Sequence, residues 1–101
     1  MRIINRKTLL DFALRHPPAK QPLLGWYQEV ERVEWKKPND IKTTFRTADI
    51  INHKRVVFNI KGNDYRLVAD VEYRLGLVFI IRVMTHAQCD KVDVTTIDHE
   101  G

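Results

Sequence analysis

The stretch that decides the fold runs from Arg55 to Lys91 and reads RVVFNIKGNDYRLVADVEYRLGLVFIIRVMTHAQCDK. It contains three strand-like segments, separated by the turn signals Gly62-Asn63 and Arg74-Leu75-Gly76. In the first two segments apolar and polar residues alternate, as they do in strands that bury one face. The stretch therefore predicts an antiparallel sheet with a core side and a polar side.

The first turn determines how the first two segments pair. A two-residue Gly-Asn loop predicts the pairs Lys61 with Asp64, Asn59 with Arg66, Val57 with Val68 and Arg55 with Asp70. The core side then consists of six apolar residues: Val56, Phe58, Ile60, Tyr65, Leu67 and Ala69.

The second turn determines the register of the third segment. A three-residue loop with glycine in its left-handed third position is a common hairpin, and Gly76 occupies that place. It predicts the core-side pairs Tyr73 with Leu77, Val71 with Phe79, Ala69 with Ile81 and Leu67 with Val83. On the polar side it pairs Val68 with Arg82 and Arg66 with Met84, and it brings Asp64 near His86. A loop of two or four residues would reverse this assignment.

The N-terminal half carries helical patterns. Arg2 to Ile4 is a candidate edge strand, and a helix follows a loose capping box at Thr8 and Asp11 and ends at His16-Pro17-Pro18. A second helix is expected from about Pro22 to Lys36, before Pro38, and a short third one begins at Asn39 or Asp40. We therefore expect one α+β domain over residues 1–101, with two N-terminal helices packed on a mainly antiparallel sheet of about four strands.

Composition limits the class of protein. The chain has 101 residues, 44% of them hydrophobic and 30% charged, which fits one globular domain. Its apolar runs are far shorter than the roughly 20 residues that cross a bilayer, and the N-terminus lacks a signal-peptide core. We expect a cytoplasmic protein without membrane association. The net charge of +4 permits a polyanionic partner such as nucleic acid.

Neither a disulfide nor a metal site is expected. The chain has one cysteine, so it forms no internal disulfide. His86 and Cys89 have a spacing that suits two metal ligands, but no second pair has matching spacing. The sequence therefore predicts neither a metal nor another cofactor.

The polar side of the predicted sheet gathers cations around a histidine. Its members are Lys61, Arg66, Arg82 and His86, with Arg55 farther along. Such a set suits metal-free cleavage of a phosphodiester, because cations stabilise the extra negative charge of the transition state. An imidazole, with a reference pKa of about 6.5, exchanges a proton at neutral pH. Attack by a ribose 2′-hydroxyl on the adjacent phosphate would make the substrate RNA.

Other interpretations of the same residues stay open. Arg66 opposite Asn59 and Arg55 opposite Asp70 are also ordinary cross-strand pairs on a solvated face. A noncatalytic RNA-binding or ribosome-binding module would use the same basic surface. A third possibility is a structural or regulatory protein that acts only within a complex.

Several blocks of sequence resemble a known family. They are VFNIKGNDYRLV (57–68), THAQCDK (85–91), TLLDF (8–12), PLLGWY (22–27) and EWKKPNDIK (34–42). With these blocks the chain resembles, over nearly its whole length, the HigB toxins of bacterial type II toxin–antitoxin systems. The resemblance implies a RelE-like fold and ribosome-dependent cleavage of mRNA. It also implies a HigA-type antitoxin with a helix-turn-helix domain, through which alone the complex would bind operator DNA.

The resemblance also implies roles for single residues. Lys61, Arg66 and His86 match basic positions of the family's active face and are assigned to catalysis. Asn63, Asp90 and Lys91 match recurring motif residues and are assigned to RNA binding, together with Arg55 and Arg82, which the register of the predicted sheet places on the same face. Tyr65 matches a motif position but points to the core, so its role is structural. Cys89 departs from the family, which commonly has a tyrosine before Asp-Lys, and a thiol cannot stack on a base as a phenol ring does.

Overall fold

A five-stranded sheet forms the centre of the computed structural model, which describes residues 1–98. The strands lie in the order β1-β5-β4-β3-β2. Their bounds are β1 Arg2–Ile4, β2 Asp49–Ile50, β3 Arg55–Ile60, β4 Tyr65–Glu72 and β5 Leu77–Thr85. Only the edge strand β1 runs parallel to its neighbour, β5. The α+β class and the mainly antiparallel sheet are confirmed, with one strand more than the four expected.

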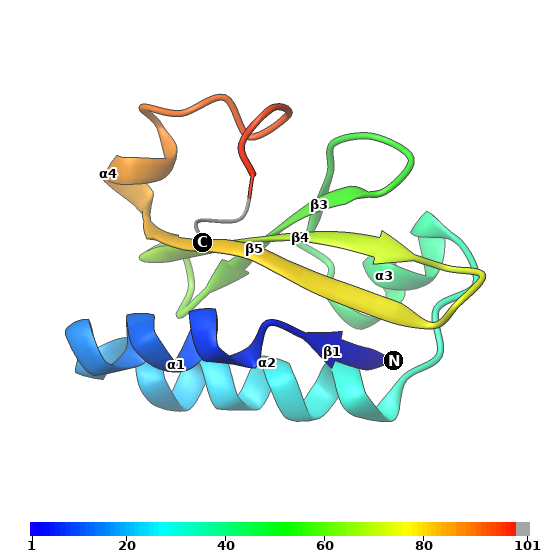
Figure 1. Cartoon of the computed structure of the whole chain (residues 1–101), viewed down its shortest axis with the longest axis horizontal. Helices are drawn as coiled ribbons and strands as arrows, with labels where there is room; N and C mark the ends of the chain where they lie inside the picture. The colour runs from blue at the N-terminus through cyan, green and yellow to red at the C-terminus, as the bar shows by residue number, and fades with distance from the viewer. Residues whose placement is uncertain (99–101) are drawn as a thin grey trace.

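Helices cover one face of the sheet, and the chain after β5 covers the other. The helices are α1 (Arg6–Arg15), α2 (Lys20–Arg32), α3 (Pro38–Thr44) and α4 (His86–Cys89), with a 3₁₀ turn at Pro17–Ala19. Figure 1 shows α1 and α2 below the sheet, and α4 with the segment that follows it above the sheet. Within residues 1–98, no helix is long and apolar enough to cross a membrane.

The ends of the helices differ from the expected positions for identifiable reasons. Helix α1 begins two residues before Thr8, and Asp11 forms an ion pair with Lys7 at 2.9 Å instead of a capping box. Helix α2 ends at Arg32, because Val33 is extended and the amino group of Met1 donates hydrogen bonds to the carbonyls of Val30 and Val33. These bonds satisfy carbonyls that a helix end leaves free, and the positive charge suits the negative end of the helix dipole.

The third helix begins two or three residues earlier along the chain than expected. Lys37 is its N-cap and Pro38 its first residue, rather than Asn39 or Asp40. The carboxylate of Asp40 accepts hydrogen bonds from the backbone N–H groups of Lys36 and Lys37, at 2.8 and 3.3 Å. Asp40 therefore stabilises the start of the helix from within its first turn.

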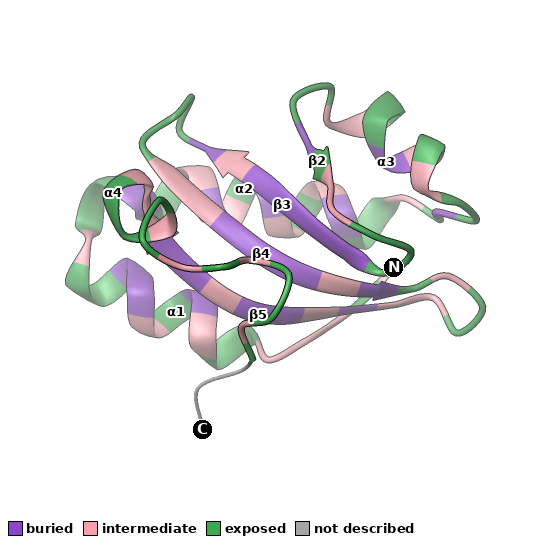
Figure 2. Cartoon of the chain, turned by 90° about the horizontal axis from the view of Figure 1, so that it is seen from above, coloured by how far each residue is buried: buried purple, intermediate pink, exposed green. Residues whose placement is uncertain are grey.

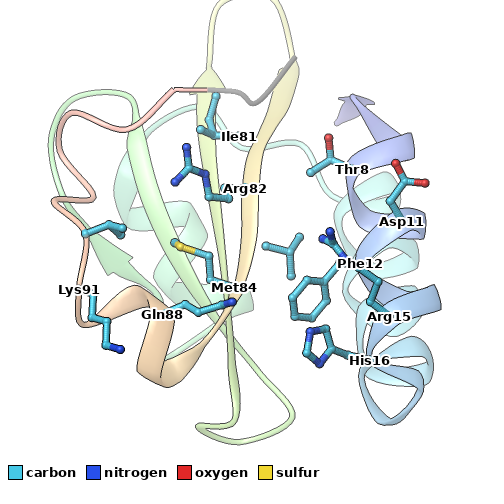
Figure 3. A pocket seen from close by; sticks show the side chains of 12 residues that line it. Thr8, Asp11, Phe12, Arg15, His16, Ile81, Arg82, Met84, Gln88 and Lys91 are labelled. Atoms are coloured by element: carbon cyan, nitrogen blue, oxygen red, sulfur yellow. The ribbon is translucent and has the colours of Figure 1, made fainter.

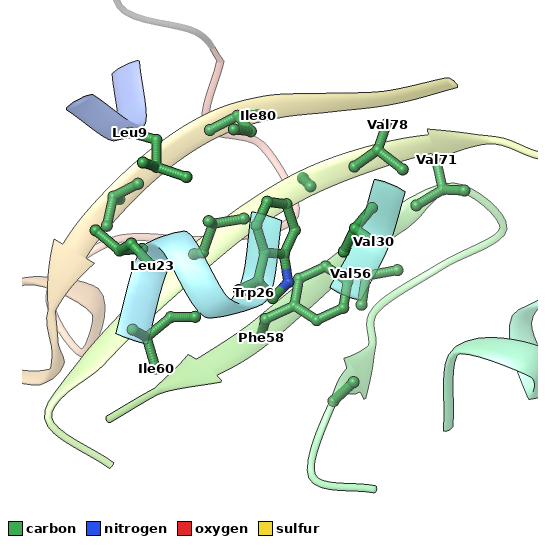
Figure 4. Packing of buried hydrophobic residues seen from close by; sticks show 14 of the residues in the cluster. Leu9, Leu23, Trp26, Val30, Val56, Phe58, Ile60, Val71, Val78 and Ile80 are labelled. Carbon is green, nitrogen blue, oxygen red and sulfur yellow. The ribbon is translucent and has the colours of Figure 1, made fainter. Parts of the chain in front are cut away.

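The main core lies between α1, α2 and the sheet. Leu23, Trp26 and Val30 of α2 are buried against the strands, and the Trp26 and Phe58 rings meet edge to face at 5.3 Å (Figure 4). All six residues expected on the core side belong to this cluster, with Tyr65 partly buried at its edge. The predicted core side is therefore confirmed for the first hairpin, whereas Phe79 and Ile81, expected on the same side, belong to the cluster on the opposite face.

The first hairpin has the predicted register. Asn59 pairs with Arg66, Val57 with Val68 and Arg55 with Asp70. The ladder ends at Ile60 and Tyr65, so Lys61 to Asp64 form a four-residue turn, closed by a 3.2 Å hydrogen bond from the N–H of Asp64 to the carbonyl of Lys61. Lys61 and Gly62 both have positive φ, 53° and 63°.

The second hairpin has a different turn from the one expected. Glu72 pairs with Leu77, so the turn contains four residues, Tyr73 to Gly76, rather than three. The predicted pairs Tyr73–Leu77, Val71–Phe79 and Ala69–Ile81 are therefore wrong. Leu77 pairs with Glu72, Val78 with Val71 and Ile80 with Ala69. A β-bulge at Ile81 then shifts the register by one residue, so that the predicted pairs Val68–Arg82, Leu67–Val83 and Arg66–Met84 are all present. The bulge keeps Arg82 on the expected face despite the longer turn.

A second apolar cluster occupies the opposite face of the sheet. Val57, Val68, Ile81 and Met84 form its buried part. Cys89 and three residues of the C-terminal segment, Val92, Val94 and Ile97, pack against it. Figure 2 shows this segment crossing above β4 and β5. The face expected to be polar is thus partly a second, smaller core.

Candidate functional site

The open end of the β4–β5 hairpin brings Arg66 and His86 together. Tyr65 pairs with Thr85 at the end of the ladder, and the N–H of His86 donates to the carbonyl of Asp64 at 3.0 Å. The Thr85 hydroxyl accepts a 3.1 Å bond from the Gln88 N–H, and the Gln88 side chain accepts a 3.0 Å bond from the Thr85 N–H. This reciprocal capping box fixes the start of α4 and with it the position of His86.

A chain of short polar contacts joins four of the predicted site residues. Arg66 Nη2 donates to Asn63 Oδ1 at 2.6 Å and lies 2.7 Å from His86 Nδ1. On the other side of the ring, His86 Nε2 lies 3.2 Å from Asp90 Oδ2. The structure therefore brings together Asn63, Arg66, His86 and Asp90, four residues to which the sequence analysis assigned a role in the site.

The chain of contacts determines the tautomer of His86. A guanidinium has only donors, so Nδ1 must accept the bond from Arg66 through its lone pair. The ring hydrogen is then assigned to Nε2, the nitrogen that lies 3.2 Å from the Asp90 carboxylate. The side chains of His86 and Asp90 are 44% and 66% exposed, so the site is open to a large ligand. The result is an oriented imidazole beside a fixed positive charge.

Lys61 lies in the turn next to this chain of contacts. Its Nζ is 3.6 Å from Asp64 Oδ2, and its side chain is 48% exposed. The carbonyl of Asp64 accepts the hydrogen bond from the N–H of His86, so Asp64 links Lys61 to His86. Lys61 adds a positive charge at the edge of the site.

Arg55 has a different environment from the other predicted RNA-binding residues. It is only 5% exposed, and its Nε and Nη2 donate to the Asp70 carboxylate at 2.8 and 3.0 Å. Its Nη1 donates to the carbonyls of Val94 and Ile97. The hydrogen bonds to Asp70 raise the pKa of Arg55 further above its usual value. Contrary to the RNA contact expected from the sequence, Arg55 anchors the C-terminal segment to the sheet.

An open groove of about 640 Å³ lies beside the site, between α1 and the junction of β5 with α4. Arg82 and Lys91, two of the predicted RNA-binding residues, line it, and Arg82 Nη2 also donates to the carbonyl of Asp98 at 3.1 Å. Arg15 and His16 line its α1 side (Figure 3). The sequence analysis treated these two only as the end of a helix. The sequence signal that could have indicated this role is an arginine followed by a histidine at the end of the helix.

Cys89 is partly buried, because it packs against the second apolar cluster. Burial raises the pKa of its thiol. Within residues 1–98 the structure assembles no group of three or more His, Cys, Asp or Glu residues able to hold a metal ion.

Comparison with known proteins gives consistent matches. Residues 19–92 match the model of a family described as HigB_toxin, the RelE-like toxic component of a toxin–antitoxin system. The mRNA interferase toxin HigB of Escherichia coli K12 is 34% identical over 92 residues, which cover 89% of this chain and 88% of that protein. The mRNA interferase HigB of Shigella flexneri matches equally well, and that of E. coli O6:H1 strain CFT073 is 22% identical over 94 residues, 91% of each chain. The chain therefore belongs to the HigB family of RelE-like toxins of toxin–antitoxin systems.

Proposed function

We propose that this protein is an endoribonuclease that cleaves mRNA on the ribosome, and that the attacking group is the ribose 2′-hydroxyl rather than a metal-bound water. The observation that carries the proposal is the 2.7 Å contact between Arg66 Nη2 and His86 Nδ1 on an open surface. An arginine fork suits a phosphate, and a neutral imidazole suits proton transfer. The printed names of the relatives, mRNA interferase, support RNA as the substrate.

In the proposed reaction a bound phosphate competes with His86 for Arg66. When the guanidinium turns its donors to the phosphate oxygens, His86 Nδ1 loses its partner and becomes free to accept a proton. The 2′-oxygen then gives its proton to Nδ1 and attacks phosphorus, while the bond from phosphorus to the 5′-oxygen breaks. The 5′-oxygen takes a proton from water, which leaves a 2′,3′-cyclic phosphate and a 5′-hydroxyl. The RNA itself supplies both the attacking 2′-oxygen and the phosphorus, so the reaction needs no other nucleophile.

The neighbouring groups suit the charges that develop. Asp90, at 3.2 Å from Nε2, faces the positive imidazolium that forms. Arg66 and Lys61 stabilise the added negative charge on the phosphate oxygens. Asn63 holds Arg66 through its side chain and its carbonyl, at 2.6 and 3.1 Å, and so sets the direction of the guanidinium.

Membership in this family implies an antitoxin partner. We propose a HigA-type antitoxin with a helix-turn-helix domain, and binding of operator DNA only through the toxin–antitoxin complex. Ribosome and mRNA are the proposed targets of the free toxin.

Mapping of mRNA 5′ ends after induced expression tests the proposal. The chain should be compared with His86→Ala and with His53→Ala, a matched change at an exposed loop histidine outside the site. We expect new 5′ ends within translated codons for the parent and for His53→Ala. For His86→Ala we expect none, although it still sediments with ribosomes. Equal growth arrest by His86→Ala and the parent contradicts the catalytic role and favours a noncatalytic ribosome binder.

A synthetic mRNA with one 2′-deoxy nucleotide at the mapped cut tests the attacking group. Cleavage on programmed ribosomes should stop at that position and should otherwise leave a 2′,3′-cyclic phosphate. Continued cleavage of the deoxy mRNA, with a 3′-hydroxyl product, would indicate attack by water instead.

A further inference from the structure

The groove between α1 and the β5–α4 junction has the charge of an anion-binding surface. Arg15 from α1, Arg82 from β5 and Lys91 from the chain after α4 line it. Among the described residues that line it, the one carboxylate, that of Asp11, is already paired with Lys7 at 2.9 Å. In the part of the chain that the structure describes, neither Arg15 nor Lys91 forms an ion pair. These two cations are therefore available to an acidic ligand.

The wall of the groove also offers a ring to a flat group. His16 is partly exposed and its ring stacks on the Phe12 ring with centroids 4.3 Å apart, whereas Phe12, Val83 and Met84 line the groove but are buried. Single-stranded RNA is commonly bound by basic residues that hold the phosphates and by aromatic or histidine rings that stack on the bases. An acidic helix of a protein would find the charges but would gain little from the His16 ring.

The groove and the Arg66–His86 site share one short helix. Helix α4 contributes His86 to the site and Gln88 to the groove, and Lys91, two residues after the helix, also lines the groove (Figure 3). The helix has four residues and is thus about 6 Å long at 1.5 Å per residue. At about 3.4 Å per nucleotide along a helical strand, this corresponds to roughly two nucleotides. A strand bound at His86 can therefore continue into the groove.

We propose that this groove binds the RNA strand next to the cleaved bond, with Arg15 and Lys91 on its phosphates and His16 beside a base. The inference rests on the proposed function, because it extends the same substrate beyond the scissile phosphate. It assigns to α1 a role in holding RNA that the sequence did not indicate.

Removal of one charge from the groove and one from the RNA tests the proposal. Arg15→Gln should be compared with Arg74→Gln, a matched change at an exposed arginine in the Tyr73–Gly76 turn, at the other end of β5. Cleavage on programmed ribosomes is then measured with mRNAs in which single phosphates near the cut are replaced by uncharged methylphosphonates. The methylphosphonate series requires no change in the protein, so it does not depend on the folding of a variant.

We expect Arg15→Gln to reduce the cleavage rate about tenfold, the effect of one charged hydrogen bond, and Arg74→Gln to leave the rate unchanged. One flanking methylphosphonate should cause a similar loss with the parent and no further loss with Arg15→Gln, because the two changes remove the same contact. That position also shows whether the 5′ or the 3′ side of the RNA occupies the groove.

Two outcomes would overturn the inference, and they are distinguishable. If the parent cleaves and Arg15→Gln cleaves equally fast, the groove does not hold RNA, even if the variant binds its antitoxin more weakly. If the parent itself does not cleave ribosome-bound mRNA, the proposed function fails and the groove proposal fails with it.

Discussion

Arg66 Nη2 lies 2.7 Å from His86 Nδ1, so a fixed cation and a titratable ring from two different segments share one hydrogen bond. The register of β4 and β5 and the capped start of α4 produce this contact. Each residue therefore holds the other in position until a ligand separates them.

Replacement of Arg66 should affect cleavage more than binding. We expect Arg66→Ala to lower the cleavage rate by about 10² to 10³, the usual loss when a donor to the transition state is removed. Arg66→Lys should restore little of the rate, because an ammonium cannot bind Asn63 and a phosphate through a planar fork. Single-turnover cleavage on programmed ribosomes, with Arg74→Ala as the control, measures this. Wild-type rates for Arg66→Ala would contradict the assigned role.

The tautomer of His86 can be observed directly. In the free protein we expect the ring hydrogen on Nε2, because Arg66 donates to Nδ1. In ¹⁵N-labelled protein at a pH where the ring is neutral, two-bond correlation spectra distinguish the two tautomers. Arg66→Ala should give a mixture of tautomers for His86 and no change for His53. A Nδ1–H form in the parent would mean that the contact is absent in solution.

The Arg55–Asp70 pair should matter for stability. Arg55→Met leaves the Asp70 carboxylate, only 16% exposed, without its partner, and should cost about 3 kcal/mol of unfolding free energy. The double variant Arg55→Met, Asp70→Leu should be more stable than Arg55→Met alone, because no uncompensated charge remains. Urea unfolding measures both. The exposed pair Arg32–Glu29 is the control, and Arg32→Met should change stability by less than about 1 kcal/mol.

Two glycines should respond to alanine in opposite directions. Gly76 has a φ of +68°, so Gly76→Ala should destabilise by about 1 kcal/mol through backbone strain alone, since a Cβ there meets no atom within 4 Å. Gly25 lies inside α2 with equally open space, and Gly25→Ala should stabilise by roughly 0.5–1 kcal/mol. Thermal unfolding of the two variants gives the comparison. Shifts of the same sign would contradict the backbone argument.

Cys89 should react slowly with alkylating agents. Burial raises the pKa of its thiol, so at pH 8 the folded chain holds less of the reactive thiolate than the unfolded chain. Iodoacetamide labelling should therefore accelerate in urea by more than it does for a free thiol.

The same shift gives a pH dependence of stability. Above about pH 8.5 the unfolded thiol loses its proton first, so the unfolded state is favoured and stability falls as pH rises. Cys89→Ala should remove this part of the decline in urea titrations between pH 7 and 10. An unchanged decline in the variant would show that other groups cause it.

Local patterns predicted the first hairpin and most of the site. The alternation around Gly62-Asn63 contains all the information that the register of β3 and β4 needs. The blocks that carry the family resemblance contain Asn63, Arg66, His86 and Asp90, which the structure joins.

The features that were missed depend on segments distant in sequence. Arg55 is buried because residues 93–98 fold back over the sheet, and no local pattern describes that return. A signal did exist, since Val57, Val68 and Met84 are apolar on the face expected to be polar. The groove was not predicted because α1 and α4 form it together from opposite ends of the chain.

The bulge at Ile81 compensates for the even number of residues in the turn of the β4–β5 hairpin. Thirteen residues separate Val68 from Arg82, an odd number, so these two can pair only with an odd turn or with an even turn and one bulged residue. Deletion of Ile81 should therefore preserve the Val71–Val78 and Val68–Arg82 pairs across a four-residue turn. Removal of Leu75 instead would allow the same two pairs only across a three-residue turn with the bulge retained. Related chains that differ by one residue here should accordingly differ in the bulge and keep the arginine and the histidine on the same face.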